Sequence, residues 1–157
     1  MIDEHLLIKY QAQLKYYQRD ELLFKRDSIA RNYFQIRVGE VKVCNINSDG
    51  KEFIQSIFSK DRGVGEPALL GGFKYPANAV VTETSEVWVL KKTDFFKLLS
   101  QNTEVHFEIS KTISQRLLYK SMMVHEISIE NPSHRILTLI NYLKHSIMKS
   151  KNLLSFT

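Results

Sequence analysis

The chain has 157 residues, of which 43% are hydrophobic and 25% charged, and its net charge at pH 7 is +5. These values are ordinary for one globular domain with an appendage, and the short apolar runs exclude a membrane-spanning helix. A single cysteine, Cys44, excludes an internal disulfide, a four-cysteine iron–sulfur site and the usual structural zinc. Acidic residues near the start and the lack of a basic-then-apolar leader lead us to expect no signal peptide and a cytoplasmic protein.

Two different periodicities mark the first half of the chain. Leu6, Leu7, Tyr10 and Leu14 have helical spacing, which predicts a helix from the start to about residue 16. Short runs rich in aromatic and β-branched residues follow, and they predict strands at 21–26, 33–38, 41–46, 53–58, 79–82 and 86–90. Strands at this spacing favour an antiparallel sandwich or roll over alternating βαβ units. The predicted fold class is therefore α+β, with an antiparallel β-roll flanked by helices.

The predicted strands 41–46 and 53–58 are joined by a strong turn signal. Asp49-Gly50 accepts the positive φ that a tight hairpin needs, so we expect an antiparallel pair here. Alternation along the first strand places Cys44 on the opposite face from Val41 and Val43. A redox role for this thiol is an alternative that would require thiolate character.

A glycine-rich stretch follows the hairpin and forms the candidate ligand-binding segment. Gly65-Glu66 runs into a predicted short helix that has Pro67 at its first position, where the missing N–H would be unpaired in any case. Free N–H groups at the start of such a helix suit an anion, and here they would come from Ala68 and Leu69. The stretch contains no arginine to neutralise an anion, and it continues into Tyr75, Pro76 and Ala77.

Near Thr93 the spacing of the apolar residues becomes helical again. We expect a short helix here, with Thr93 as its cap. A longer helix is predicted from Asn102 to about Ile129. Its apolar face is longer than one small roll can cover, which favours a partner helix in a dimer. The residues predicted at this dimer interface are Ile109, Ile113, Leu117 and Met122.

The chain breaks at Asn131-Pro132, and Ser133 is a plausible cap for a further helix. Residues 131–157 contain Arg135, Lys144, Lys149 and Lys151 and no acidic residue. This basic end indicates either a nucleic-acid neighbour or a solvated helix face.

The order of these pieces resembles the Crp/Fnr family of bacterial transcription regulators along nearly the whole chain. The resemblance rests on residues 33–43 and Asp49-Gly-Lys-Glu in the roll, Gly65-Glu-Pro-Ala-Leu-Leu, Ser114-Gln-Arg-Leu-Leu in the long helix, and Arg135-Ile. It implies a homodimer, a sensor roll at 1–100, a dimerisation helix at 101–130 and the start of an incomplete winged helix-turn-helix at 131–157. We therefore expect the effector-sensing and dimerisation part of a longer DNA-binding regulator, with an unknown small-molecule effector and no membrane.

The resemblance also implies roles for the glycine-rich stretch. In members that bind cyclic nucleotides, a glutamate accepts from the ribose, and Glu66 has that place; the amides of Ala68 and Leu69 would hold the phosphate. The arginine that neutralises the phosphate is replaced by Tyr75-Pro76. Losing a charge-assisted pair weakens binding by about tenfold to a hundredfold. The family's base contact would fall on Ser121, beside Lys120.

A pocket unsuited to cyclic AMP is therefore predicted. Another small ligand, a vestigial pocket and a purely structural turn all remain open, as does a stand-alone interaction module whose roll binds no ligand. A cupin-type metal site is excluded, because all five histidines fall on expected helices outside the roll: His5, His106, His125, His134 and His145. We expect no cofactor, no metal and no catalysis.

Overall fold

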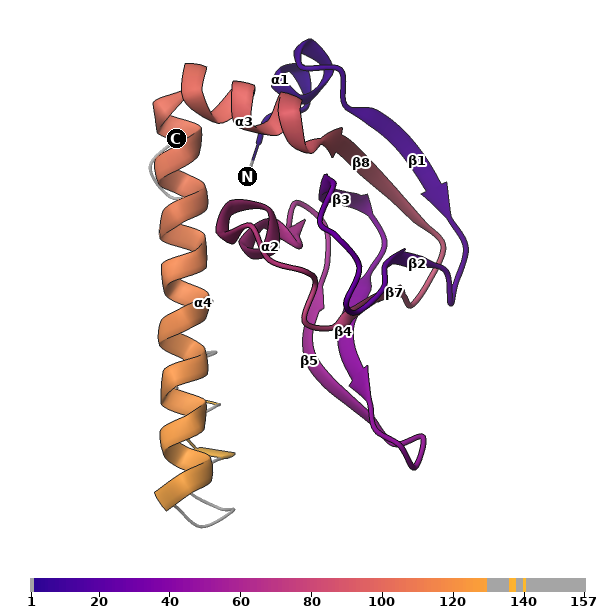
Figure 1. Ribbon diagram of the computed structural model, residues 1–157, viewed down its shortest axis with the longest axis vertical. Helices are drawn as coiled ribbons and strands as arrows, with labels where there is room; N and C mark the ends of the chain where they lie inside the picture. Colours follow the sequence, from indigo (N-terminus) through magenta and orange to yellow (C-terminus); the bar gives the residue numbers. More distant parts are fainter. Residues whose placement is uncertain (1, 130–135, 138–139, 141–157) are drawn as a thin grey trace. The chain divides into compact units, whose positions relative to one another are not determined.

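The computed structural model describes residues 2–129 together with 136, 137 and 140 (Figure 1). The chain divides into two compact units, Met1–Ile109 and Ser110–Thr157, and each is described by itself.

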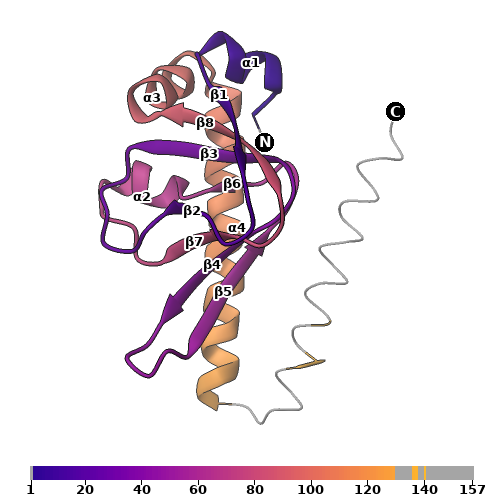
Figure 2. The ribbon, with the colours of Figure 1, turned by 90° about the vertical axis from the view of Figure 1, so that its right-hand side faces the viewer.

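The first unit is built around two four-stranded antiparallel sheets. One sheet has the strand order β1-β8-β3-β6, and the other has the order β2-β7-β4-β5 (Figures 1 and 2). The strands are β1 (Gln13–Tyr17), β2 (Leu22–Phe24), β3 (Asn32–Val38), β4 (Val41–Ile46), β5 (Glu52–Phe58), β6 (Gly63–Val64), β7 (Asn78–Val81) and β8 (Ser85–Lys91). The predicted antiparallel roll is confirmed.

The core of the roll is apolar and draws on both sheets. Phe34 and Ile36 from one sheet meet Val41 and Val81 from the other. The buried cluster also contains Leu23, Val64, Ala79, Val87 and Val89, with Tyr17, Phe24, Val43 and Phe58 packed against it. Burial of this apolar surface is the main favourable term in folding of the roll.

The described residues form helices as well as strands. The helices are α1 (Glu4–Lys9), α2 (Glu66–Gly71) and α3 (Lys92–Gln101), and α4 (Thr103–Ile129) follows α3 directly. Tyr33 projects from the outer face of β3 and stacks on Phe95 of α3, with ring centroids 4.6 Å apart. On the same face, Gln35 Nε2 donates to the backbone oxygen of Ile2 at 2.8 Å. The outer face of β3 is thus covered by the N-terminal segment and α3.

Three details of the sequence-based prediction are wrong. The first helix ends at Lys9, and the segment carrying Leu14 forms β1 instead, where Leu14 pairs with Trp88 of β8. Tertiary pairing with β8 outweighs the local helical spacing. The short strand β6 was not predicted. Thr93 does not cap α3, which begins at Lys92 after the N-cap residue Lys91.

The β4–β5 hairpin forms as predicted. Gly50 adopts a φ of 77°, and Asn47 Oδ1 accepts from the backbone N–H groups of Asp49 and Lys51. The predicted long helix is also present, beginning one residue later than expected. None of the described helices is long and apolar enough to cross a membrane. Residues 131–157, for which the start of a DNA-binding domain with the helix cap Ser133 is predicted, fall almost wholly outside the described residues.

Candidate functional site

The candidate site is the turn at Gly65 that leads into α2. Gly65 is the N-cap residue with a φ of 85°, a conformation that favours glycine, and Pro67 lies in the first turn. Gly72 ends the helix with a φ of 69°. The sequence therefore predicted this backbone correctly. However, the N–H of Ala68 is not free as expected, because it donates to the backbone oxygen of Gly65 at 3.2 Å.

Two aromatic rings pack directly against this turn. Tyr75 and Phe24 are stacked, with centroids 3.7 Å apart and planes 9° from parallel. A Cβ atom on Gly65 would lie 2.9 Å from a carbon of each ring. Gly65 is therefore required twice, once by its positive φ and once by the rings. The rings of Phe24 and Tyr75 thus occupy the space that a side chain at Gly65 would take.

Tyr75, which stands at the place of the expected arginine, is part of the core. Its side chain is 3% exposed, and its hydroxyl donates to the backbone oxygen of Asn32 at 3.2 Å. Burial raises the pKa of Tyr75 to about 12, so the ring is neutral at physiological pH. It supplies no positive charge. The neighbouring Ala77 is buried, whereas Pro76 and Lys74 are exposed.

The carboxylate of Glu66 lies on the other side of β3 from the stacked rings. Glu66 is buried, and a Cβ atom on Gly63 would lie 3.1 Å from its Oε1 and 3.0 Å from the Tyr33 hydroxyl oxygen. Tyr33 faces outward from β3, while Phe34 faces inward and contacts Phe24.

These residues differ from the nucleotide cassette that the resemblance implies. The cradle has no arginine, the rings of Phe24 and Tyr75 fill the space beside Gly65, and Leu69 is buried in the core. An anion placed beside the helix start would be desolvated against aromatic carbon without a cationic partner, which is unfavourable. Binding at this turn requires either a shift of the stack or a ligand that replaces it.

The remaining predicted residues lie on α4. Ile109, at the end of the first unit, is 6% exposed. In the second unit Ile113 is half-buried, whereas Leu117 is 68% exposed and Met122 is 36% exposed. Ser121 and Lys120 are also exposed. Of the four predicted interface residues, Leu117 and Met122 thus offer most apolar surface to a partner.

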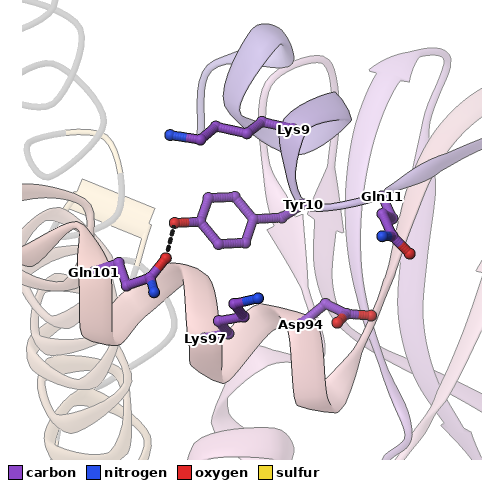
Figure 3. Close-up of a pocket in the computed structure, with 6 residues that line it drawn as sticks. All are labelled: Lys9, Tyr10, Gln11, Asp94, Lys97 and Gln101. Carbon is purple, nitrogen blue, oxygen red and sulfur yellow. Dashed lines mark hydrogen bonds between the residues drawn. The ribbon is translucent and has the colours of Figure 1, made fainter.

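A second, small pocket lies between α1 and α3, and sequence reasoning missed it (Figure 3). Its volume is about 150 Å³. Tyr10 closes one side, and its hydroxyl donates to Gln101 Oε1 at 2.6 Å. The other lining residues are Lys9, Gln11, Asp94 and Lys97. They come from two segments far apart in sequence, so no local motif could have revealed the pocket.

Cys44 is buried, and its surroundings oppose ionisation. Glu52 interacts with the thiol and also binds Lys42 Nζ at 2.8 Å, so Cys44 lies on the face of Lys42, opposite Val41, as predicted. Burial, followed by the hydrogen bond with Glu52, raises the pKa of the thiol to about 11. A reactive, redox-sensing thiol needs the reverse shift. Among the described residues no cluster of histidine, cysteine and carboxylates could hold a metal ion.

Comparisons with known proteins agree with this geometry. Residues 14–102 match the cyclic nucleotide-binding domain family. The chain is 32% identical over 101 residues to an anaerobic regulatory protein of Bacillus subtilis, a match that covers 64% of this chain and 42% of that protein. The chain thus spans less than half the length of this curated relative.

Solved structures share the fold. The Thermus thermophilus catabolite activator protein superposes with a TM-score of 0.71 and 20% identity, covering 80% of this chain and 58% of that one. The c-di-GMP responsive global regulator CLP of Xanthomonas campestris gives a TM-score of 0.73 at 16% identity, covering 88% of this chain and 71% of its own. This chain has the predicted roll followed by a long helix, and these structures share its fold. The chain belongs to the cyclic nucleotide-binding domain family, and the expected resemblance to the sensor domain of Crp/Fnr-type regulators is confirmed.

Proposed function

We propose that this chain is the effector-sensing and dimerisation part of a cytoplasmic, DNA-binding transcription regulator, and that its effector is not cyclic AMP. The observation that carries the proposal is the turn at Gly65: it keeps the backbone of a nucleotide cassette, but Phe24 and Tyr75 fill it. A regulator with this turn responds to a ligand that displaces or extends the aromatic stack.

The proposed mechanism is a shift between two dimer arrangements. A ligand that binds one arrangement better than the other moves the population toward it by its difference in affinity. In this proposal helix α4 transmits the change in dimer arrangement to the DNA-binding segment proposed beyond Asn131-Pro132. The cassette turn and α4 are connected through the chain by β7, β8 and α3, which are short, packed elements.

Homodimerisation is proposed through the apolar face of α4. Leu117 and Leu118 are 68% and 60% exposed, and Phe107 is 72% exposed. Large apolar side chains in such number along one helix favour a partner helix over solvent. In this proposal Ile113 extends the seam from Leu117, which is four residues away on the same face of the helix, while Ile109 stays within its own protomer. Phe107, Leu118 and Met122 lie on a different face of α4.

Sedimentation velocity of the chain and of its Leu117→Glu variant tests the dimer. We expect a dimer at micromolar concentration that the charged side chain converts to monomer, because a buried carboxylate facing its symmetry mate is strongly unfavourable. Gln115→Glu, which also adds one negative charge at an exposed position, serves as the matched control and leaves the dimer intact. A monomeric wild-type chain contradicts the proposal.

A stand-alone interaction module is the second candidate, and the filled cassette favours it. The two candidates differ in their response to small molecules. Thermal unfolding in the presence of a metabolite panel separates them, since a ligand at a hundred times its dissociation constant stabilises by about 2.7 kcal/mol, a shift of several degrees. A module without a ligand site unfolds at the same temperature throughout the panel.

A further inference from the structure

The loop between β2 and β3 and the segment after α2 together form an exposed surface that the proposed sensing function does not use. It consists of Lys25, Arg26, Ile29, Arg31, Phe73 and Lys74, and we call it the basic loop surface. All six side chains are exposed. The two segments adjoin because Ile29 and Lys74 form an antiparallel bridge.

Positive charge is concentrated on this surface. Lys25, Arg26, Arg31 and Lys74 contribute four positive charges, and the acidic residue within the loop is Asp27, which pairs with Arg26 at 3.5 Å. The local net charge is therefore +3, from four cations and one acid, in a chain whose total is +5. Clustered cations of this kind raise the local concentration of an anionic partner and accelerate association.

Exposed apolar side chains lie among these cations. Ile29 is 62% exposed and Phe73 is 50% exposed. Phe73 could stack on a nucleobase, but Ile29 has no flat face and phosphates gain nothing from aliphatic carbon, so Ile29 favours a protein partner over nucleic acid. A protein segment that carries carboxylates and an apolar side chain complements both features.

The backbone of the surface is held firmly in place. Asp27 adopts a φ of 64°, its N–H donates to the backbone oxygen of Tyr75, and the N–H of Tyr75 donates to that of Ser28. Arg26 N–H donates to Asn78 Oδ1 at 2.9 Å. A loop fixed by these bonds loses little conformational freedom on binding, which favours affinity.

We infer that the basic loop surface is a docking site for an acidic protein segment that also bears an apolar side chain. The docking surface uses none of the residues proposed for dimerisation through α4. It would join the regulator to a partner protein through a rigid, positively charged edge of the sensor roll.

Fluorescence anisotropy of the full chain tests this inference with a labelled peptide composed of glutamate and leucine. We expect saturable binding that weakens with added salt. The double variant Lys25→Glu/Arg31→Glu should weaken binding by about tenfold or more, because each reversed charge removes one attraction and adds one repulsion. Lys15→Glu/Lys60→Glu, which reverses two exposed cations elsewhere on the roll, should change it by less than about twofold.

Two further comparisons fix the chemistry of the partner. The charge-preserving variant Ile29→Ser/Phe73→Ser should also weaken binding, and a peptide of glutamate and serine should bind less tightly than the one with leucine. No saturable binding, or equal losses in the two charge-reversal variants, would overturn the inference. Tighter binding of duplex DNA with the same dependence on Lys25 and Arg31 would overturn it in favour of a nucleic-acid surface.

Discussion

Truncation of Tyr75 should destabilise the roll strongly, whether or not a ligand is present. In Tyr75→Ala the ring stacked on Phe24 is lost from a site that is 3% exposed, and its hydroxyl bond to Asn32 is lost with it. Comparable losses of a buried aromatic side chain cost about 3–5 kcal/mol. In a unit of this size that corresponds to a fall in melting temperature of roughly 12–20 °C, at about 4 °C per kcal/mol.

Tyr75→Phe is the matched variant, since it keeps the ring and removes the hydroxyl. This variant should lose one hydrogen bond, which lowers the free energy of unfolding by about 0.5–1.5 kcal/mol. The loss is somewhat larger if no water replaces the hydroxyl at the Asn32 oxygen. Urea denaturation followed by circular dichroism measures both differences under identical conditions. The reasoning is refuted if Tyr75→Ala costs less than about 1 kcal/mol, because the ring would then not be part of the core.

The remaining predictions concern ionisation of buried groups. Burial raises the pKa of Cys44 from 9.0 to about 11. The thiol should therefore react with a disulfide reagent at pH 8 about a hundredfold more slowly in the folded chain than in urea. Equal rates would mean that the folded chain has an accessible thiolate. Burial raises the folded-state pKa of Cys44 and of Tyr75 above the unfolded values, and the pKa of Tyr75 reaches about 12. The stability that these shifts contribute is fully present below pH 9 and is lost as the pH rises toward 12. Tyr75→Phe should flatten the loss between pH 10 and 12, and an unchanged profile would contradict the raised pKa of Tyr75.

Much of the fold could be predicted because its strands are short, apolar and separated by strong turn signals such as Asp49-Gly50. The segment around Leu14 could not, since its leucine and tyrosine spacing suits a helix and only pairing with β8 makes it a strand. Likewise, β6 has two residues and no periodicity to detect.

The candidate site was predictable in its backbone but not in its contents. Gly65 and Pro67 predict the turn, because glycine followed closely by proline is typical of a turn that leads into a helix. Tyr75, at the place of the expected arginine, indicated that a positive charge was missing. The stacking of Tyr75 on Phe24 could not be predicted, because Phe24 lies on a strand distant in the sequence and no local pattern relates the two rings. The inward or outward direction of Glu66 depends on the same tertiary packing.

Calorimetric titration of the chain with cyclic AMP tests the central claim most directly. The filled turn predicts no heat of saturable binding and no change in melting temperature up to millimolar nucleotide, where a binder with a dissociation constant of about 10 µM would gain roughly 2.7 kcal/mol. Saturable binding of one nucleotide per chain, accompanied by a melting temperature several degrees higher, would contradict the account, because the stack of Phe24 and Tyr75 would then yield to a cyclic nucleotide after all.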